Sequence, residues 1–91
     1  MFVAKVIGNV VATQKNESLV GSKLLIVKPI QIIPEQKISG PIIAVDTIGA
    51  GIGEVVIVSM GSSARNAAQS GSVADAAVVG IIDSFDVDDR S

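Results

Sequence analysis

Residues 49–60 read Gly-Ala-Gly-Ile-Gly-Glu-Val-Val-Ile-Val-Ser-Met, a glycine-rich loop followed by an aliphatic run. β-Branched side chains lose rotamer freedom in a helix and pack well on a pleated surface, so the run Val55–Met60 is expected to form a strand. The rest of the chain has the same character, with 14 Val and 13 Ile residues among 91. An all-β fold class is therefore expected.

Five apolar runs are separated by glycine, proline and polar turns. They are Phe2–Thr13, Leu24–Ile33, Ile42–Ile48, Val55–Met60 and Ala76–Ile82. Such a series is typical of a barrel or a sandwich. One short helix is expected after the fourth run, with Ser62 or Ser63 as its N-cap and Gly71 at its C-terminal exit. The order indicates a five-stranded OB-like β-barrel with one short helix.

The charges divide the chain into a body and a tail. The formal net charge is −2, and four of the nine acids lie among the last nine residues. These four acids are Asp83, Asp86, Asp88 and Asp89. We expect one domain over residues 1–83 and an acidic C-terminal tail over residues 84–91, which either frays in solvent, the interpretation that we favour, or contacts a cationic partner. Neither part has the basic surface of a phosphate-binding protein.

The strand-like runs are apolar on both faces, whereas a half-buried antiparallel strand alternates apolar and polar residues. Val55 and Ile57 point one way, while Val56, Val58 and Met60 point the other. The first and last runs share this pattern, with Ile7 opposing Val6 and Ile81 opposing Val78. The second apolar face lies either under the helix and loops or against another subunit. We favour another subunit, since one short helix cannot cover three strands.

Composition excludes several functions. The chain has no Cys and no His, so it lacks a thiol nucleophile, the usual general base and the commonest transition-metal ligands. No catalytic residue, metal or cofactor is expected, and we interpret the chain as not an enzyme. The longest uncharged run covers ten residues, Val55–Ala64, against about 18 for a membrane span. Two Phe are the only aromatics, too few for stacking nucleic-acid bases.

The glycine loop does not fit a nucleotide-binding fingerprint. That fingerprint needs its third glycine where Glu54 stands, followed by a helix, yet a strand-like run follows. Two interpretations stay open. The glycines either form a tight connection that needs positive φ angles, or permit close approach of neighbouring chains around an axis.

Two further motifs have a structural and a functional interpretation. The turn Gly61–Arg65 either holds an anion or caps the helix, with Arg65 pairing to Asp46, Glu54 or Asp75. Asp46 and Asp75 have two interpretations, as a hydrolytic carboxylate pair or as separate turn or ion-pair residues. Isolated acids in a small barrel are more often turn or ion-pair residues.

The ordered set of motifs resembles the EutN/CcmL family of bacterial microcompartment vertex proteins. The segments that carry the resemblance are residues 10–15, Leu19, residues 21–25, Val45-Asp46, residues 49–54, residues 61–65 and residues 75–83. The resemblance implies an OB-like barrel assembled as a homopentamer at the five-fold corners of a shell with hexagonal facets. The implied partners are other copies and hexameric facet proteins, without nucleic acid or membrane, and the implied location is a microcompartment shell in the cytoplasm.

The resemblance also implies which residues lie at subunit contacts or near the axis. These are Gly49, Ala50, Gly51, Gly53, Glu54, Gly61, Ser62, Ser63, Ala64 and Arg65. Thr13, Lys15, Asp46 and Asp75 are further candidates for an interface or the outer rim. Our hypothesis is that Glu54 and Arg65 pair at the contact, while the glycines permit close chain approach.

Two other classes of function stay open. The first is an OB-like module that binds an oligonucleotide or a small ligand as a monomer or dimer. The second is an enzyme that uses Ser62 or Ser63, or a carboxylate pair.

Overall fold

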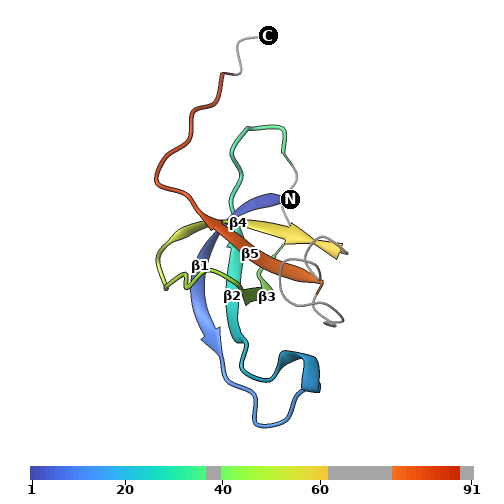
Figure 1. The fold of residues 1–91 in the computed structure, drawn as a ribbon. Coiled ribbons are helices and arrows are strands. Elements are labelled where there is room, and N and C mark those ends of the chain that lie inside the picture. Colours follow the sequence, from blue (N-terminus) through green and yellow to red (C-terminus); the bar gives the residue numbers. More distant parts are fainter. Residues whose placement is uncertain (37–39, 62–74, 89–91) are drawn as a thin grey trace.

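The computed structural model describes residues 1–36, 40–61 and 75–88, whose strands wrap into a barrel (Figure 1). The strands are β1 (Phe2–Val10), β2 (Lys23–Pro29), β3 (Ile42–Asp46), β4 (Val55–Met60) and β5 (Ala76–Ile81). A single 3-10 turn, η1 (Glu17–Leu19), precedes β2, and the Asn16 side chain accepts a hydrogen bond from the Ser18 N–H at its start. Within these ranges no helix is long and apolar enough to cross a membrane.

The barrel is closed, with the strand order β1-β2-β3-β5-β4. All neighbouring strands are antiparallel except β3 and β5, which run parallel, with Val45 opposite Ala77 and Asp46 opposite Val78. Because β3 neighbours β5 while β4 returns to β1, the chain follows a Greek-key path of the OB type. The predicted all-β, five-stranded OB-like barrel is confirmed.

The core is aliphatic and narrow. Its largest fully buried side chains are Val6, Leu25, Val27, Val56, Val58 and Val78. Buried alanines, among them Ala4 and Ala44, fill the remaining space, as the interior of a small barrel requires. The β-branched residues noted in the sequence therefore provide most of the interior.

Two register shifts bend the sheet into the closed shape. One lies in β1 between Val6 and Gly8, and the other lies between β4 and β5 at Ile57/Val58. A Cβ on Gly8 would lie 3.3 Å from Ile26 Cδ1, so this glycine gives the isoleucine of the neighbouring strand room to lie across β1. Bulges of this kind increase the local twist that barrel closure needs.

Several strands end earlier than the apolar runs. β2 ends at Pro29, a residue that has no backbone N–H to donate. The pairing of β2 with β3 already stops at Val27, so no β3 carbonyl depends on a donor from Pro29. β3 ends at Asp46, whose side chain accepts the next two free N–H groups of the turn. The predicted helix with its caps Ser62, Ser63 and Gly71 lies outside the described residues, and the domain boundary at residue 83 stays a prediction.

Candidate functional site

The glycine loop joins β3 to β4 and is held against β1. Gly49 has a φ of 82° and Gly53 a φ of 93°, values that L side chains rarely adopt. The Gly53 N–H donates to the Val6 carbonyl at 2.8 Å, and the Val6 N–H donates to the Glu54 carbonyl at 2.9 Å. The predicted need for positive φ is confirmed at these two glycines but not at Gly51.

Glu54 closes the loop on itself. Its Oε1 accepts a hydrogen bond from the Gly51 N–H at 2.6 Å, and its own N–H donates to the Gly51 carbonyl at 3.2 Å. A Cβ on Gly51 would lie 3.4 Å from that Oε1, an ordinary contact with the end of a flexible side chain. The carboxylate is therefore partly satisfied within its own chain.

Asp46 and Lys23 anchor the other end of the loop. Asp46 Oδ1 accepts hydrogen bonds from the Ile48 and Gly49 N–H groups, both at 3.1 Å, and Oδ2 lies 3.9 Å from Lys23 Nζ. The Lys23 ammonium donates to the Ala50 carbonyl at 2.7 Å. The Asp46 side chain is 2% exposed and that of Lys23 is 50% exposed. This is the turn and ion-pair role that the sequence allowed for Asp46, with Lys23 as its partner.

The second predicted motif is described only at its first residue. Gly61 has a φ of 64°, and its N–H donates to the Asp75 carbonyl at 2.8 Å, which joins the end of β4 to the start of β5. Asp75 itself is exposed. Ser62, Ser63, Ala64 and Arg65 lie outside the described residues, so the proposed pairing of Arg65 with a carboxylate stays a prediction.

Thr13 and Lys15 lie elsewhere on the molecule. Both are exposed in the loop between β1 and β2, at the end of the barrel opposite the C-terminal segment (Figure 1). The structure thus brings Lys23, Asp46 and the glycine loop together, while Thr13 and Lys15 form a separate surface.

The outer face of the barrel carries the second set of apolar side chains. Val56 and Val58 point into the core, while Val55 and Ile57 of the same strand are partly exposed. Met60, the last residue of β4, is exposed although it alternates with Val58. Ile7 on β1, Ile43 on β3 and Ile81 on β5 are exposed, as are Ile48 and Ile52 around the glycine loop.

The described residues show neither a metal-binding cluster nor an unpaired buried polar side chain. They contain no group of three or more His, Cys, Asp or Glu residues that could hold a metal ion. Over these same ranges every buried side-chain nitrogen or oxygen has a hydrogen-bond partner. The polar groups of the loop are engaged in shaping the turn.

The sequence model of the family described as ethanolamine utilisation protein EutN/carboxysome matches residues 1–83. The chain belongs to the EutN/CcmL family. One similar protein is the bacterial microcompartment shell vertex protein GrpN of Rhodospirillum rubrum (strain F11). GrpN is 53% identical over 89 residues, which cover 94% of this chain and 97% of GrpN. The shell vertex protein PduN of Salmonella typhimurium is 48% identical over 89 residues, covering 93% of this chain and 98% of PduN.

Solved structures show the same barrel. The pentameric microcompartment shell protein GrpN from Rhodospirillum rubrum superposes with a TM-score of 0.81, covering 96% of this EutN/CcmL chain and 99% of GrpN. The pentameric shell protein MSM0273 from the RMM microcompartment superposes with a TM-score of 0.79 at 30% identity, over 100% of both chains. The resemblance to the EutN/CcmL family drawn from the sequence motifs is confirmed.

The structure identifies two residues of the candidate site, Lys23 and Ile52, that the sequence pattern does not single out. Lys23 is one of several lysines in the sequence, and nothing in its spacing indicates that it reaches Asp46 and Ala50. Ile52 lies within the predicted loop, where its 62% exposure makes it the prominent apolar side chain. Ala50, by contrast, is completely buried, so its side chain cannot touch a neighbouring chain.

Proposed function

We propose that this chain forms homopentamers that cap the five-fold vertices of a bacterial microcompartment shell, and that its role is structural. The relatives GrpN and PduN are named as shell vertex proteins, and the solved structures of GrpN and MSM0273 are described as pentameric. These relatives favour a shell component over an oligonucleotide- or ligand-binding module and over an enzyme.

The observation that carries the proposal is the exposed aliphatic face of the single barrel. Isoleucines on three different strands, Ile7, Ile43 and Ile81, remain exposed although a soluble barrel ordinarily presents polar residues there. Moving an isoleucine from full exposure to full burial contributes about 1.5–3 kcal/mol, and these side chains, already about half buried, gain about half of that in an interface. A cyclic interface uses two different patches on each copy, and it closes after five copies if the rotation between neighbours is one fifth of a turn.

The glycine loop is proposed as part of this contact. Gly49, Gly51 and Gly53 present backbone without side chains, and Ile52 projects beside them. Glu54 keeps capacity for a second partner, because a carboxylate has about four acceptor positions and the Gly51 N–H uses one. The proposed pairing of Glu54 with Arg65 of a neighbouring copy is therefore compatible with the bond inside the loop.

The outer rim is proposed to meet hexameric facet proteins of the shell. The exposed β1–β2 loop with Thr13 and Lys15, and the exposed Asp75, are the candidate rim residues. A flat sheet of hexagonal tiles closes only where five-fold units are inserted, so the shape of the ring is itself the function.

Native mass spectrometry of the purified chain tests the assembly. We expect a particle of five times 9.2 kDa at micromolar concentration. A folded, soluble species with the mass of one chain would contradict the proposal.

A matched pair of glycine variants tests the loop. We expect Gly51→Val to reduce the pentamer fraction, because the new side chain stands at the proposed contact and meets Glu54. Gly40→Val is the control, since a Cβ there meets nothing within 4 Å and its φ is ordinary. Equal pentamer fractions for both variants would remove the loop from the contact.

Reconstitution tests the role in the shell. Hexameric facet proteins of the same organism, co-expressed with this chain, should yield closed polyhedral particles in electron micrographs. We expect the same facet proteins without this chain to give particles that lack their vertices, and unchanged particles would contradict the vertex assignment.

A further inference from the structure

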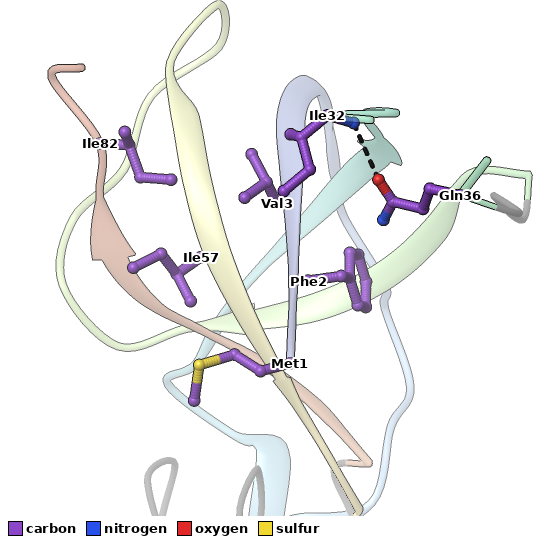
Figure 2. Close-up of a pocket in the computed structure, with 7 residues that line it drawn as sticks. All are labelled: Met1, Phe2, Val3, Ile32, Gln36, Ile57 and Ile82. Atoms are coloured by element: carbon purple, nitrogen blue, oxygen red, sulfur yellow. Dashed lines mark hydrogen bonds between the residues drawn. The ribbon is translucent and has the colours of Figure 1, made fainter. Parts of the chain in front are cut away.

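An apolar groove of about 320 Å³ opens at the end of the barrel where the N-terminus and the C-terminal segment lie. It is lined by Met1, Phe2, Val3, Ile32, Gln36, Ile57 and Ile82. Figure 2 shows Ile57 and Ile82 on one side of Val3, with Ile32 and Gln36 on the other. The Gln36 side chain is held by the Ile32 N–H, which donates to its Oε1 at 2.8 Å. Six of the seven lining side chains are therefore apolar, and the one polar side chain is engaged.

The C-terminal segment has the complementary pattern. After Ile82, the chain leaves the barrel and leads away from it (Figure 1). Phe85 and Val87 remain 50% and 47% exposed. In an extended chain residues two apart point to the same side, so Phe85 and Val87 form one apolar edge while Asp86 points to the other.

A pair of lysines stands beside the groove. Lys5 is two residues from Val3 on β1 and faces the same side, about 7 Å along the strand. Lys28 is its direct partner across the β1–β2 ladder, and both are exposed. Directly opposed like charges destabilise a sheet, and neither lysine has an ion-pair partner among the described residues. An acidic segment docked nearby would relieve this repulsion.

We propose that residues 83–88 of one copy dock in the groove of the neighbouring copy, with Phe85 and Val87 in the groove. Asp86, on the outer edge of the segment, and Asp83, at the bend where the segment begins, then lie within reach of the long side chains of Lys5 and Lys28. This inference rests on the pentamer proposed above. Each copy then gives one segment and receives one, which is the arrangement that a closed cyclic ring requires.

The length of the segment fits a neighbour. Six extended residues reach about 20 Å. The two shorter extents of the molecule are 24 and 22 Å, so the segment spans about the width of one adjacent barrel. Its own groove already includes Ile82, the point from which the segment departs.

Cross-linking in the natural cysteine-free background tests the docking. The double variants Val87→Cys/Val3→Cys and Val87→Cys/Ile57→Cys, treated with a short bismaleimide, should give a covalent ladder up to the pentamer on a denaturing gel. Each single-cysteine variant is the control and should stop at the dimer. Cross-linking confined to one chain would show that the segment folds back on its own groove. That result, or no cross-link in either variant, overturns the inference.

Dissociation on dilution tests the apolar edge. We expect Phe85→Ser/Val87→Ser to raise the concentration at which half the pentamer dissociates by at least about tenfold. Val20→Ser is the control, because Val20 is an exposed apolar residue that follows η1 in the β1–β2 connection, and this connection lies at the opposite end of the barrel (Figure 1). It should leave that concentration unchanged. Equal behaviour of the two variants overturns the inference.

A charge exchange tests the lysine pair. Lys5→Glu/Lys28→Glu should weaken the pentamer, and adding Asp83→Lys/Asp86→Lys should restore it. Failure of the restoration overturns the charge pairing. If the wild-type chain is pentameric and the variants form equally stable pentamers, the docking is refuted and the proposed function stands. If the wild-type chain is monomeric, the proposed function is refuted.

Discussion

The glycine loop and the groove beside the C-terminal segment belong to one barrel, but they differ in how far the single chain provides partners for their side chains. In the loop, Asp46, Lys23 and Glu54 bond to backbone groups of the same chain. In the groove, aliphatic side chains are partly open to solvent, and the neighbouring Lys5 and Lys28 repel each other. The loop is therefore shaped before any assembly, while the groove gains stabilisation only when something covers it.

This contrast separates two kinds of substitution. Changes to the residues that shape the loop, namely Asp46, Glu54 and the positive-φ glycines, should lower the stability of the single barrel, because hydrogen bonds or backbone geometry are lost. Changes on the outer apolar surface should leave the barrel intact and weaken assembly. Unfolding is best compared at one fixed protein concentration, since assembly adds a concentration-dependent contribution.

The largest effect on folding is expected for Asp46→Ala. The substitution leaves the Ile48 and Gly49 N–H groups without their acceptor and removes the ion-pair partner of Lys23, so it should lower the free energy of unfolding by about 2–4 kcal/mol. Urea denaturation measures the loss. Lys23→Met is the matched control and should cost about 1 kcal/mol or less, because Lys23 is half exposed and Asp46 keeps its N–H donors. Equal losses would mean that the ion pair, and not the turn, stabilises the loop.

Backbone geometry in the loop should give the next largest effect. Gly53→Ala forces an L side chain to a φ of 93° and should cost about 1–2 kcal/mol. Gly51→Ala should cost less than about 0.5 kcal/mol, since its φ is ordinary and its Cβ meets only a flexible carboxylate. Thermal unfolding of both variants separates these values, and an equal cost would argue against strain as the cause.

A smaller effect is expected for Glu54→Gln. The amide retains an acceptor for the Gly51 N–H but loses the negative charge, so the free energy of unfolding should fall by about 0.5–1 kcal/mol. Glu35→Gln is the control, because Glu35 is exposed and should show no change in denaturation. A loss of the same size for Glu35→Gln would point to net charge and not to the loop bond.

Ile43→Ser on the outer face should affect assembly more than folding. Ile43 is 54% exposed, so the single barrel should lose less than about 1 kcal/mol. Native mass spectrometry should nevertheless show a reduced pentamer fraction. An unchanged fraction would show that this part of β3 lies outside the contact.

The predicted strands and their observed ends differ for a local physical reason. Apolar character continues past Asp46 to Ile48, but the Asp46 carboxylate takes the N–H groups of Ile48 and Gly49 and turns the chain. Similarly, β1 ends at Val10 although the apolar run reaches Thr13. Periodicity reports which residues prefer burial, whereas hydrogen-bond partners decide where a ladder stops.

The candidate site was predictable in part. The positive φ angles of Gly49 and Gly53 agree with the glycine pattern, because few other residues tolerate them. The pairing of Lys23 with Asp46 was not predictable, since the two residues come from opposite strands of the β2–β3 ladder and their register depends on the whole sheet. Arg65 and the three residues before it lie outside the described residues, so their roles stay predictions.

The sequence by itself determined the fold class and the family, because β-branched runs between glycine turns have few stable solutions and the ordered motifs are specific. It also determined that apolar side chains would occupy both faces of the strands. Only the tertiary structure decided which of them are core and which remain exposed. A one-residue register shift, such as the one at Ile57/Val58, changes which face a side chain takes, and this shift depends on contacts between strands distant in the sequence.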